Sequence, residues 1–221
     1  MKNKLIIAAL LSALTINAAA AAAESVVRGN VGTKYTSDYF RRGAALSTEA
    51  VQAQVGFNTA IAGVDIFGDF FTNQGTSDSV DTNELTLGVG TGILDDRMSA
   101  YVGVYNTDSS GSDNDLEAFA QVGLNSILSP TVSVYRDTSD DLYTYEGTIG
   151  HTFDLNIVDV ELGGSLGNTD SSAVEEYTYT GAKLTVSKTF SEVNVYTDIG
   201  VTDTENRDSE TVWGLGLSLK F

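Results

Sequence analysis

The chain has 221 residues, with 30 acidic and 12 basic side chains and a formal net charge of −18 at pH 7. Because binding to nucleic-acid phosphates needs a basic face, this charge argues against nucleic acid as a partner. The absence of cysteine from the sequence excludes disulfides and lipid attachment at a cysteine.

The first element along the chain is an export signal over residues 1–23. Two lysines near the start form its positive region, an apolar run follows, and the alanines at 18–23 supply the small residues that a signal peptidase needs. The apolar run is too short to span a bilayer comfortably, so we expect cleavage after Ala23 rather than a retained anchor. The mature chain, 24–221, is expected to be one domain, because no linker or charge block divides it.

Segments in which apolar and polar residues alternate fill the rest of the chain. In the second segment, for example, Val51, Val55 and Phe57 alternate with Gln52 and Gln54. Such a period of two predicts strands that have one apolar face. We expect them at 28–40, 48–61, 63–73, 83–94, 97–107, 115–127, 131–138, 141–153, 157–168, 175–189, 192–202 and 210–221.

The connections between these segments alternate between long and short. The long, polar ones are expected at 41–47, 74–82, 108–114, 139–140, 169–174 and 203–209. The short ones lie near Ala62, Asp95–Asp96, Leu128–Pro130, Leu155–Asn156 and Ser191. Short turns on one side and longer loops on the other are typical of outer-membrane barrels, where the short turns are periplasmic.

These patterns together predict an all-β fold, a single antiparallel transmembrane β-barrel of about 12 strands. No apolar stretch of the mature chain reaches the ~20 residues of a membrane helix. Backbone groups in lipid need internal partners, so a sheet that spans a membrane must close. A secreted β-sandwich or adhesin would show similar alternation. The long strands and the absence of any helix-period segment favour the barrel.

The last segment, 210–221, carries the clearest alternation and ends on an aromatic residue. Its large apolar residues are Trp213, Leu215, Leu217, Leu219 and Phe221, and the residues between them are small or polar. We expect Leu217 to face lipid and Gly216 to face the lumen. We interpret Phe221 as the assembly signal that the barrel-assembly machinery recognises.

The first hairpin contains Ser37–Tyr39, then Arg42–Gly43, then a second strand with Gln52 or Gln54. In these features, over about residues 28–75, it resembles the opening of the TorF-like porin family. Where that family often has Arg-Gly-Ile-Ser, this chain has Arg-Gly-Ala-Ala at 42–45. The resemblance implies a small porin-like barrel in a Gram-negative outer membrane, and it brings no catalytic residues.

The positions expected to face the lumen carry more acids than bases. They are Lys34, Asp38, Gln52, Gln54, Asn58, Asp65, Asp69, Glu84, Glu117, Gln121, Glu146, Lys183 and Asp198. A charged lining of one sign selects for ions of the other sign. We therefore predict an outer-membrane porin-like channel for passive diffusion of small solutes or cations through a narrow acidic lumen. A non-conducting barrel, structural or loop-displaying, stays open as the alternative.

The glycines expected to face the lumen are interpreted as leaving room for water. They include Gly88, Gly90, Gly103, Gly123, Gly214 and Gly216. An eight-strand barrel is filled by side chains, whereas 16–18 strands leave an aqueous channel. Twelve strands lie between these sizes.

Residues that could carry chemistry are few. His151 is the single histidine, no Gly-x-Ser-x-Gly elbow occurs, and the acidic loops lack EF-hand spacing. Arg41 and Arg42 are expected where the first strand leaves the outer leaflet, to contact lipid phosphates or cap the rim. We predict no enzyme activity, no cofactor and no metal site. The expected partners are outer-membrane lipid, the barrel-assembly machinery, and small solutes or cations.

Overall fold

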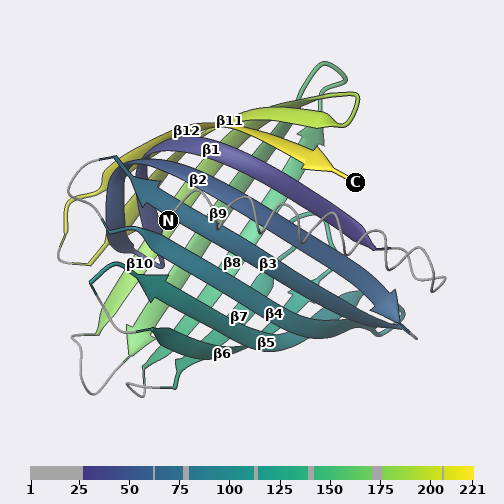
Figure 1. Ribbon diagram of the computed structural model, residues 1–221. Coiled ribbons are helices and arrows are strands. Elements are labelled where there is room, and N and C mark those ends of the chain that lie inside the picture. Colours follow the sequence, from purple (N-terminus) through teal and green to yellow (C-terminus); the bar gives the residue numbers. More distant parts are fainter. Residues whose placement is uncertain are drawn as a thin grey trace.

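The computed structural model describes residues 27–61, 63–76, 80–111, 114–138, 142–170, 176–205 and 207–221. In these ranges twelve antiparallel strands form one closed barrel, in which each strand pairs with its sequence neighbours and β1 pairs with β12 (Figure 1). The all-β barrel fold predicted from the sequence is confirmed. The expected export signal lies outside the described residues. None of the described segments is a helix of the length and apolar character that a membrane span requires.

The strand bounds are β1 Arg28–Arg41, β2 Ala44–Ile61, β3 Val64–Gly75, β4 Thr82–Ile93, β5 Met98–Ser109, β6 Asp115–Leu124, β7 Thr131–Asp137, β8 Tyr143–Asp154, β9 Asp159–Asp170, β10 Tyr177–Phe190, β11 Val193–Thr204 and β12 Glu210–Lys220. Most bounds lie within a few residues of the predicted ones. The largest difference is at β2, which begins at Ala44, whereas 41–47 was expected to be a long loop. That prediction was wrong, because β1 and β2 are joined by a tight turn at Arg42–Gly43.

The barrel has an apolar exterior and a polar interior, the reverse of a water-soluble core. Among the described residues, the hydrophobic ones that are buried are Ala50 and Tyr179, while fifteen polar or charged residues are buried. Large apolar side chains lie on the outside, including Leu215 with 57% and Ile199 with 50% of their surface exposed. The period of two produces this arrangement, because alternate side chains of a strand point to opposite faces.

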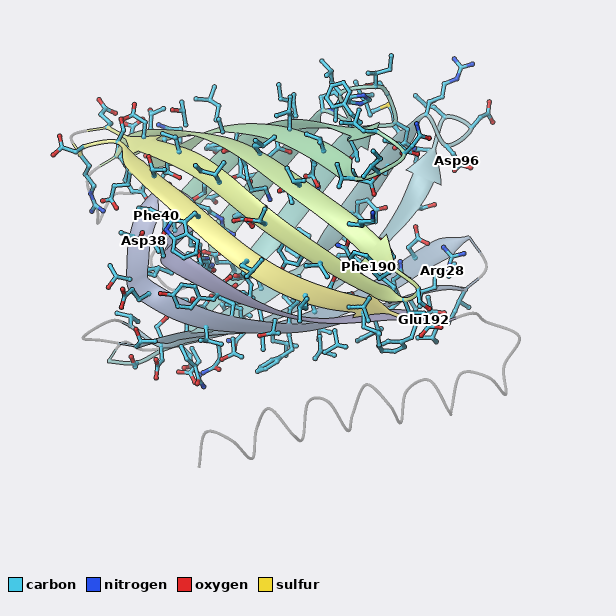
Figure 2. The ribbon with its side chains drawn as sticks, turned by 90° about the horizontal axis from the view of Figure 1, so that it is seen from above. Arg28, Asp38, Phe40, Asp96, Phe190 and Glu192 are labelled. Atoms are coloured by element: carbon cyan, nitrogen blue, oxygen red, sulfur yellow. The ribbon has the colours of Figure 1, made fainter. Side chains whose placement is uncertain are left out.

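Both ends of the described chain lie at the end of the barrel that carries the short turns. Figure 2 shows Arg28, Phe190, Glu192 and Asp96 at this end, with Asp38 toward the other. The turns here place Asp95 and Asp96 at positive φ values of 56° and 61°, which aspartate tolerates better than most residues. The opposite end carries most of the longer connections. The predicted alternation therefore holds with two exceptions: the first hairpin has a tight turn, and residues 125–130, where a short turn was expected, form a connection as long as those at the opposite end.

The pairing of β1 with β12 closes the ring, and we call this pairing the seam. The Gly29 N–H donates to the Phe221 carbonyl at 2.7 Å, and the Phe221 N–H donates to the Gly29 carbonyl at 3.0 Å. The Phe221 ring lies against Gly29, where a Cβ would collide with it. The terminal residue therefore takes part in closing the barrel.

Candidate functional site: the barrel lumen

A cavity of about 1220 Å³ lies inside the barrel. Of the charged residues predicted to face the lumen, those that line it are Lys34, Asp38, Asp69, Glu84, Lys183 and Asp198. The amides of Gln52 and Gln54 line it too. Asp65 and Gln121 take the same inward face through their register with Gly90 and Tyr101 but lie outside this cavity. Glu117 and Glu146 are also inward, and both are engaged by other side chains.

The tip of the first hairpin leaves the barrel wall and bends inward. β1 pairs with β12 only from Asn30 to Thr36, although β12 continues as far as Glu210. The register between β1 and β2 shifts at Tyr39, and Glu49 has a positive φ of 47°. We call residues 37–49 the inward hairpin; its bend is visible where β1 meets β2 (Figure 1).

The inward hairpin touches strands on different sides of the ring. The Tyr39 hydroxyl donates to Glu84 on β4 at 2.8 Å. On the other side, the Thr204 hydroxyl on β11 donates to the Gly43 carbonyl at 2.9 Å. The Tyr177 hydroxyl on β10 donates to the Arg42 carbonyl at 3.3 Å. A tip that contacts β4, β10 and β11 at once lies across the lumen.

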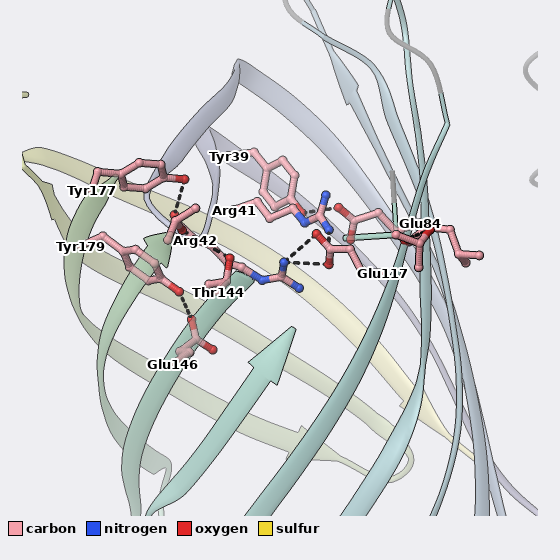
Figure 3. Close-up of polar contacts among 12 residues, drawn as sticks. Tyr39, Arg41, Arg42, Glu84, Glu117, Thr144, Glu146, Tyr177 and Tyr179 are labelled. Atoms are coloured by element: carbon pink, nitrogen blue, oxygen red, sulfur yellow. Dashed lines mark hydrogen bonds and ion pairs between the residues drawn. The ribbon is translucent and has the colours of Figure 1, made fainter. Parts of the chain in front are cut away.

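Two arginines of this hairpin reach the far wall and bind one carboxylate (Figure 3). Arg42 Nη1 lies 2.7 and 2.9 Å from the two oxygens of Glu117, and Arg41 Nη2 lies 3.0 Å from one of them. The Glu117 side chain is 7% exposed. The Arg42 guanidinium lies 3.6 Å from the ring centre of Tyr135, and the Arg41 guanidinium 4.4 Å from that of Tyr105. We call this cluster the arginine clasp.

The prediction that Arg41 and Arg42 lie at the outer leaflet was wrong. They neither contact lipid phosphates nor cap the outer rim, because the inward bend carries them into the lumen. Sequence reasoning therefore missed two lumen cations. The available signal was weak: residues 44–50 lack the large apolar side chains at alternate positions that a lipid-facing strand needs.

A second ion pair lies on the inner wall beside the cavity. Lys34 Nζ on β1 lies 2.8 Å from Asp198 Oδ2 on β11. The two strands are separated by β12, which places Gly214 between them, and a Cβ there would collide with the Lys34 chain. The missing side chain at Gly214 is what lets the two charges meet.

The space beside most of the inward glycines is filled by aromatic rings, contrary to the expectation of water. Phe67 lies over Gly88, and Phe119 lies over Gly103. Tyr101 covers Gly90 and Tyr196 covers Gly216 in the same way, whereas Gly123 has only Ser99 and Thr131 close by. A ring needs a neighbour without a side chain to lie flat on a sheet, so these glycines serve packing.

Aromatic rings are concentrated on one half of the inner wall. Phe67 lies 5.8 Å from Tyr101 and 6.4 Å from Phe119, and Phe119 lies 6.1 Å from Tyr135, all between ring centres. The opposite half, on β8–β11, presents mostly small residues to the cavity. They include Thr148, Gly150, Gly163, Ser165, Gly181 and Gly200. The lumen is thus packed on one side and open on the other.

The single histidine, His151, borders the cavity, but alternation along β8 places its side chain on the outer face. His151 shares the outward face of β8 with Phe153, and its ring centre lies 4.4 Å from that ring. Its Nδ1 lies 2.7 Å from the Ile127 carbonyl, so this nitrogen carries the proton, because a carbonyl can only accept. Within the described residues, no three His, Asp or Glu side chains are grouped as a metal site would require. The absence of enzyme activity stays a prediction.

No family model and no curated protein sequence matches the chain, so the TorF-like resemblance stays a prediction. Solved structures of small porins share its fold. The KdgM porin has a TM-score of 0.58 and 15% identity, covering 87% of this chain and 99% of that one. The NanC porin has a TM-score of 0.56 and 14% identity, covering 87% and 100%. An outer-membrane channel from Pseudomonas putida F1 has a TM-score of 0.55 and 12% identity, covering 88% and 95%.

Proposed function

We propose that this chain is an outer-membrane diffusion channel that admits small polar solutes and prefers cations. An exposed apolar exterior on a closed barrel suits lipid, because each lipid-facing strand presents alternate apolar residues. Leu217 on β12 and Leu87 on β4 have 48% and 44% of their surfaces exposed on this exterior. A signal peptide at residues 1–23 would export the chain toward a Gram-negative outer membrane.

The charge arrangement inside the lumen carries the proposed selectivity. The two hairpin arginines share one carboxylate, Glu117, and Lys34 forms an ion pair with Asp198. Three further carboxylates accept hydrogen bonds from neutral groups: Asp69 from Gln54 at 2.8 Å, Glu84 from Tyr39 at 2.8 Å and Glu146 from Tyr179 at 2.7 Å. A hydrogen bond from a neutral donor leaves the negative charge in place. Such carboxylates attract cations into a confined lumen.

This chemistry differs from that of the ligand reported with one structural neighbour. A structure of the KdgM porin with disordered oligogalacturonate has a TM-score of 0.58 and 15% identity, covering 88% of this chain and 99% of that one. Galacturonate units carry carboxylates, which the acids of this lumen would repel. The substrates we propose are therefore cationic or neutral small solutes.

The test is reconstitution of the refolded mature chain into planar bilayers. Under a KCl gradient we expect discrete conductance steps and a reversal potential of cation-selective sign. Asp69→Asn and Glu146→Gln should together move that potential toward zero, because each removes a lumen charge and keeps a hydrogen-bonding amide. An anion-selective wild-type channel would refute the acidic-lumen assignment.

The alternative is a non-conducting barrel, and the inward hairpin favours it. The hairpin crosses the lumen, and aromatic rings fill one half of the inner wall. A barrel that is folded and inserted, as shown by heat-modifiable migration in gels, but that gives no conductance would support this alternative.

A further inference from the structure

We infer that the inward hairpin forms the constriction of the channel and that the arginine clasp holds it in place. Arg41, Arg42 and Glu117 then set the size limit for solutes. This inference rests on the proposed diffusion function and adds to it the element that determines which solutes pass.

The position of the arginine clasp in the ring requires the hairpin to cross the lumen. Between β1 and β6 lie the strands β2–β5 on one side and β7–β12 on the other, so the two are nearly opposite. Arg42 and Glu117 can therefore meet only through the interior (Figure 3). The residues Asp38, Tyr39 and Phe40 of the same hairpin line the cavity, so a solute inside it meets the hairpin.

The contact between the two arginines and Glu117 is a buried ion-pair cluster with several hydrogen bonds. The carboxylate of Glu117 is 7% exposed and receives three hydrogen bonds from two guanidinium groups. Charge-assisted hydrogen bonds are the stronger ones, and removing one partner of a buried ion pair leaves an uncompensated charge. Gly43 at the turn has a φ of +79°, and a Cβ there would lie 2.6 Å from the Cβ of Tyr179. The turn is therefore seated against β10 as well.

The backbone pairing near the base of the hairpin is interrupted. The Asp38–Thr48 pairing follows Thr36–Ala50 with a break between them, and a second irregularity occurs at Tyr39. These two breaks interrupt the ladder where the strands bend inward. Beyond Thr36 the backbone of β1 no longer pairs with β12, and the Ser37 hydroxyl accepts the next hydrogen bond, from the Trp213 N–H at 3.1 Å. Contacts of the tip, rather than the continuous sheet, therefore keep the hairpin across the lumen.

The first experiment removes the hairpin. Replacing residues 38–48 by Asn-Gly joins Ser37 to Glu49 through a tight turn that suits a β-hairpin. We expect at least about a twofold rise in single-channel conductance and entry of larger uncharged solutes in liposome swelling, because an unobstructed barrel has a wider lumen. Heat-modifiable migration in gels shows that the variant is folded.

The second experiment releases the clasp while keeping the hairpin. Glu117→Gln removes the buried charge, and Asp69→Asn is the matched control, which removes a lumen charge outside the hairpin. Nitroxides on Ala45→Cys and Ala118→Cys report the distance from the hairpin to β6, since the chain has no other cysteine. Glu117→Gln should broaden the distance distribution and raise the size limit, whereas Asp69→Asn should change only ion selectivity.

The outcomes separate this inference from the proposed function. A conducting wild type whose conductance and size limit survive removal of the hairpin would overturn the constriction. An unchanged distance in Glu117→Gln, with an unchanged size limit, would overturn the role of the clasp. If both the wild type and the hairpin-less barrel are folded but silent, the channel function and the constriction fail together. A silent wild type with a conducting hairpin-less barrel would refute free diffusion and support the hairpin as the obstruction.

Discussion

Deleting the terminal residue, Phe221, should weaken the seam. The structure separates this loss into two contributions, the backbone hydrogen bonds of Phe221 and the packing of its ring. Deleting Phe221 removes two backbone hydrogen bonds, at 2.7 and 3.0 Å, together with the ring that lies against Gly29. Phe221→Ala removes the ring alone. With roughly 0.5–1.5 kcal/mol for each hydrogen bond, the deletion should be less stable than Phe221→Ala by about 1–3 kcal/mol. At about 1.4 kcal/mol for each factor of ten, this is roughly a 5- to 150-fold shift in the folding equilibrium.

Urea unfolding of the refolded barrel, followed by tryptophan fluorescence, measures this difference. The single tryptophan, Trp213, lies on β12 with its ring centre 5.6 Å from that of Tyr35 on β1, so it reports on the seam. Phe190→Ala is the matched control, an aromatic residue at the same barrel end and away from the seam (Figure 2). If the deletion is as stable as Phe221→Ala, the backbone closure argument is wrong. Normal amounts of heat-modifiable deleted protein in outer membranes would refute Phe221 as the assembly signal.

Three further predictions concern selectivity, facing and packing. Asp65→Asn with Asp69→Asn should lower the cation-selective reversal potential; an unchanged potential would place both charges outside the ion path. A substitution of Glu117 is not combined with these two, because Glu117 is paired with two arginines. Leu217→Cys should react with lipid-soluble probes and Ser218→Cys with water-soluble thiol reagents, and the reverse pattern would show a register slip. Gly88→Val should destabilise the barrel by about 1–3 kcal/mol in urea, because its side chain would displace an aromatic ring; a stability equal to the wild type would contradict that packing.

The sequence predicted the strands best where lipid would impose a strict pattern. Residues such as Val51, Val55 and Phe57 must alternate because every second side chain faces outward on an apolar surface. Residues 44–50 belong to the same strand β2, but most of them lie in the inward hairpin. The lipid-facing alternation does not apply there, and these residues were therefore expected to form a loop. The inward destination of Arg42 depends on Glu117, far away in sequence, and no local pattern carries that information.

The side chains that pack against the inward glycines could not be predicted from the sequence either. The inward face of Gly88 and Gly103 follows from alternation, and the register agrees with it. Which neighbour fills the space beside each glycine depends on the stagger between adjacent strands. Phe67 reaches Gly88 from β3, and Phe119 reaches Gly103 from β6, so both rings cross from a neighbouring strand.

Three separate contacts fix the register of β1. At one end Gly29 must meet Phe221, in the middle Lys34 must meet Asp198 across Gly214, and at the far end Arg42 must meet Glu117. A slip of one residue would turn Lys34 toward the exterior and misplace all three contacts. The strand that closes the ring with β12 is therefore aligned by contacts at its near end, at its middle and at the opposite wall.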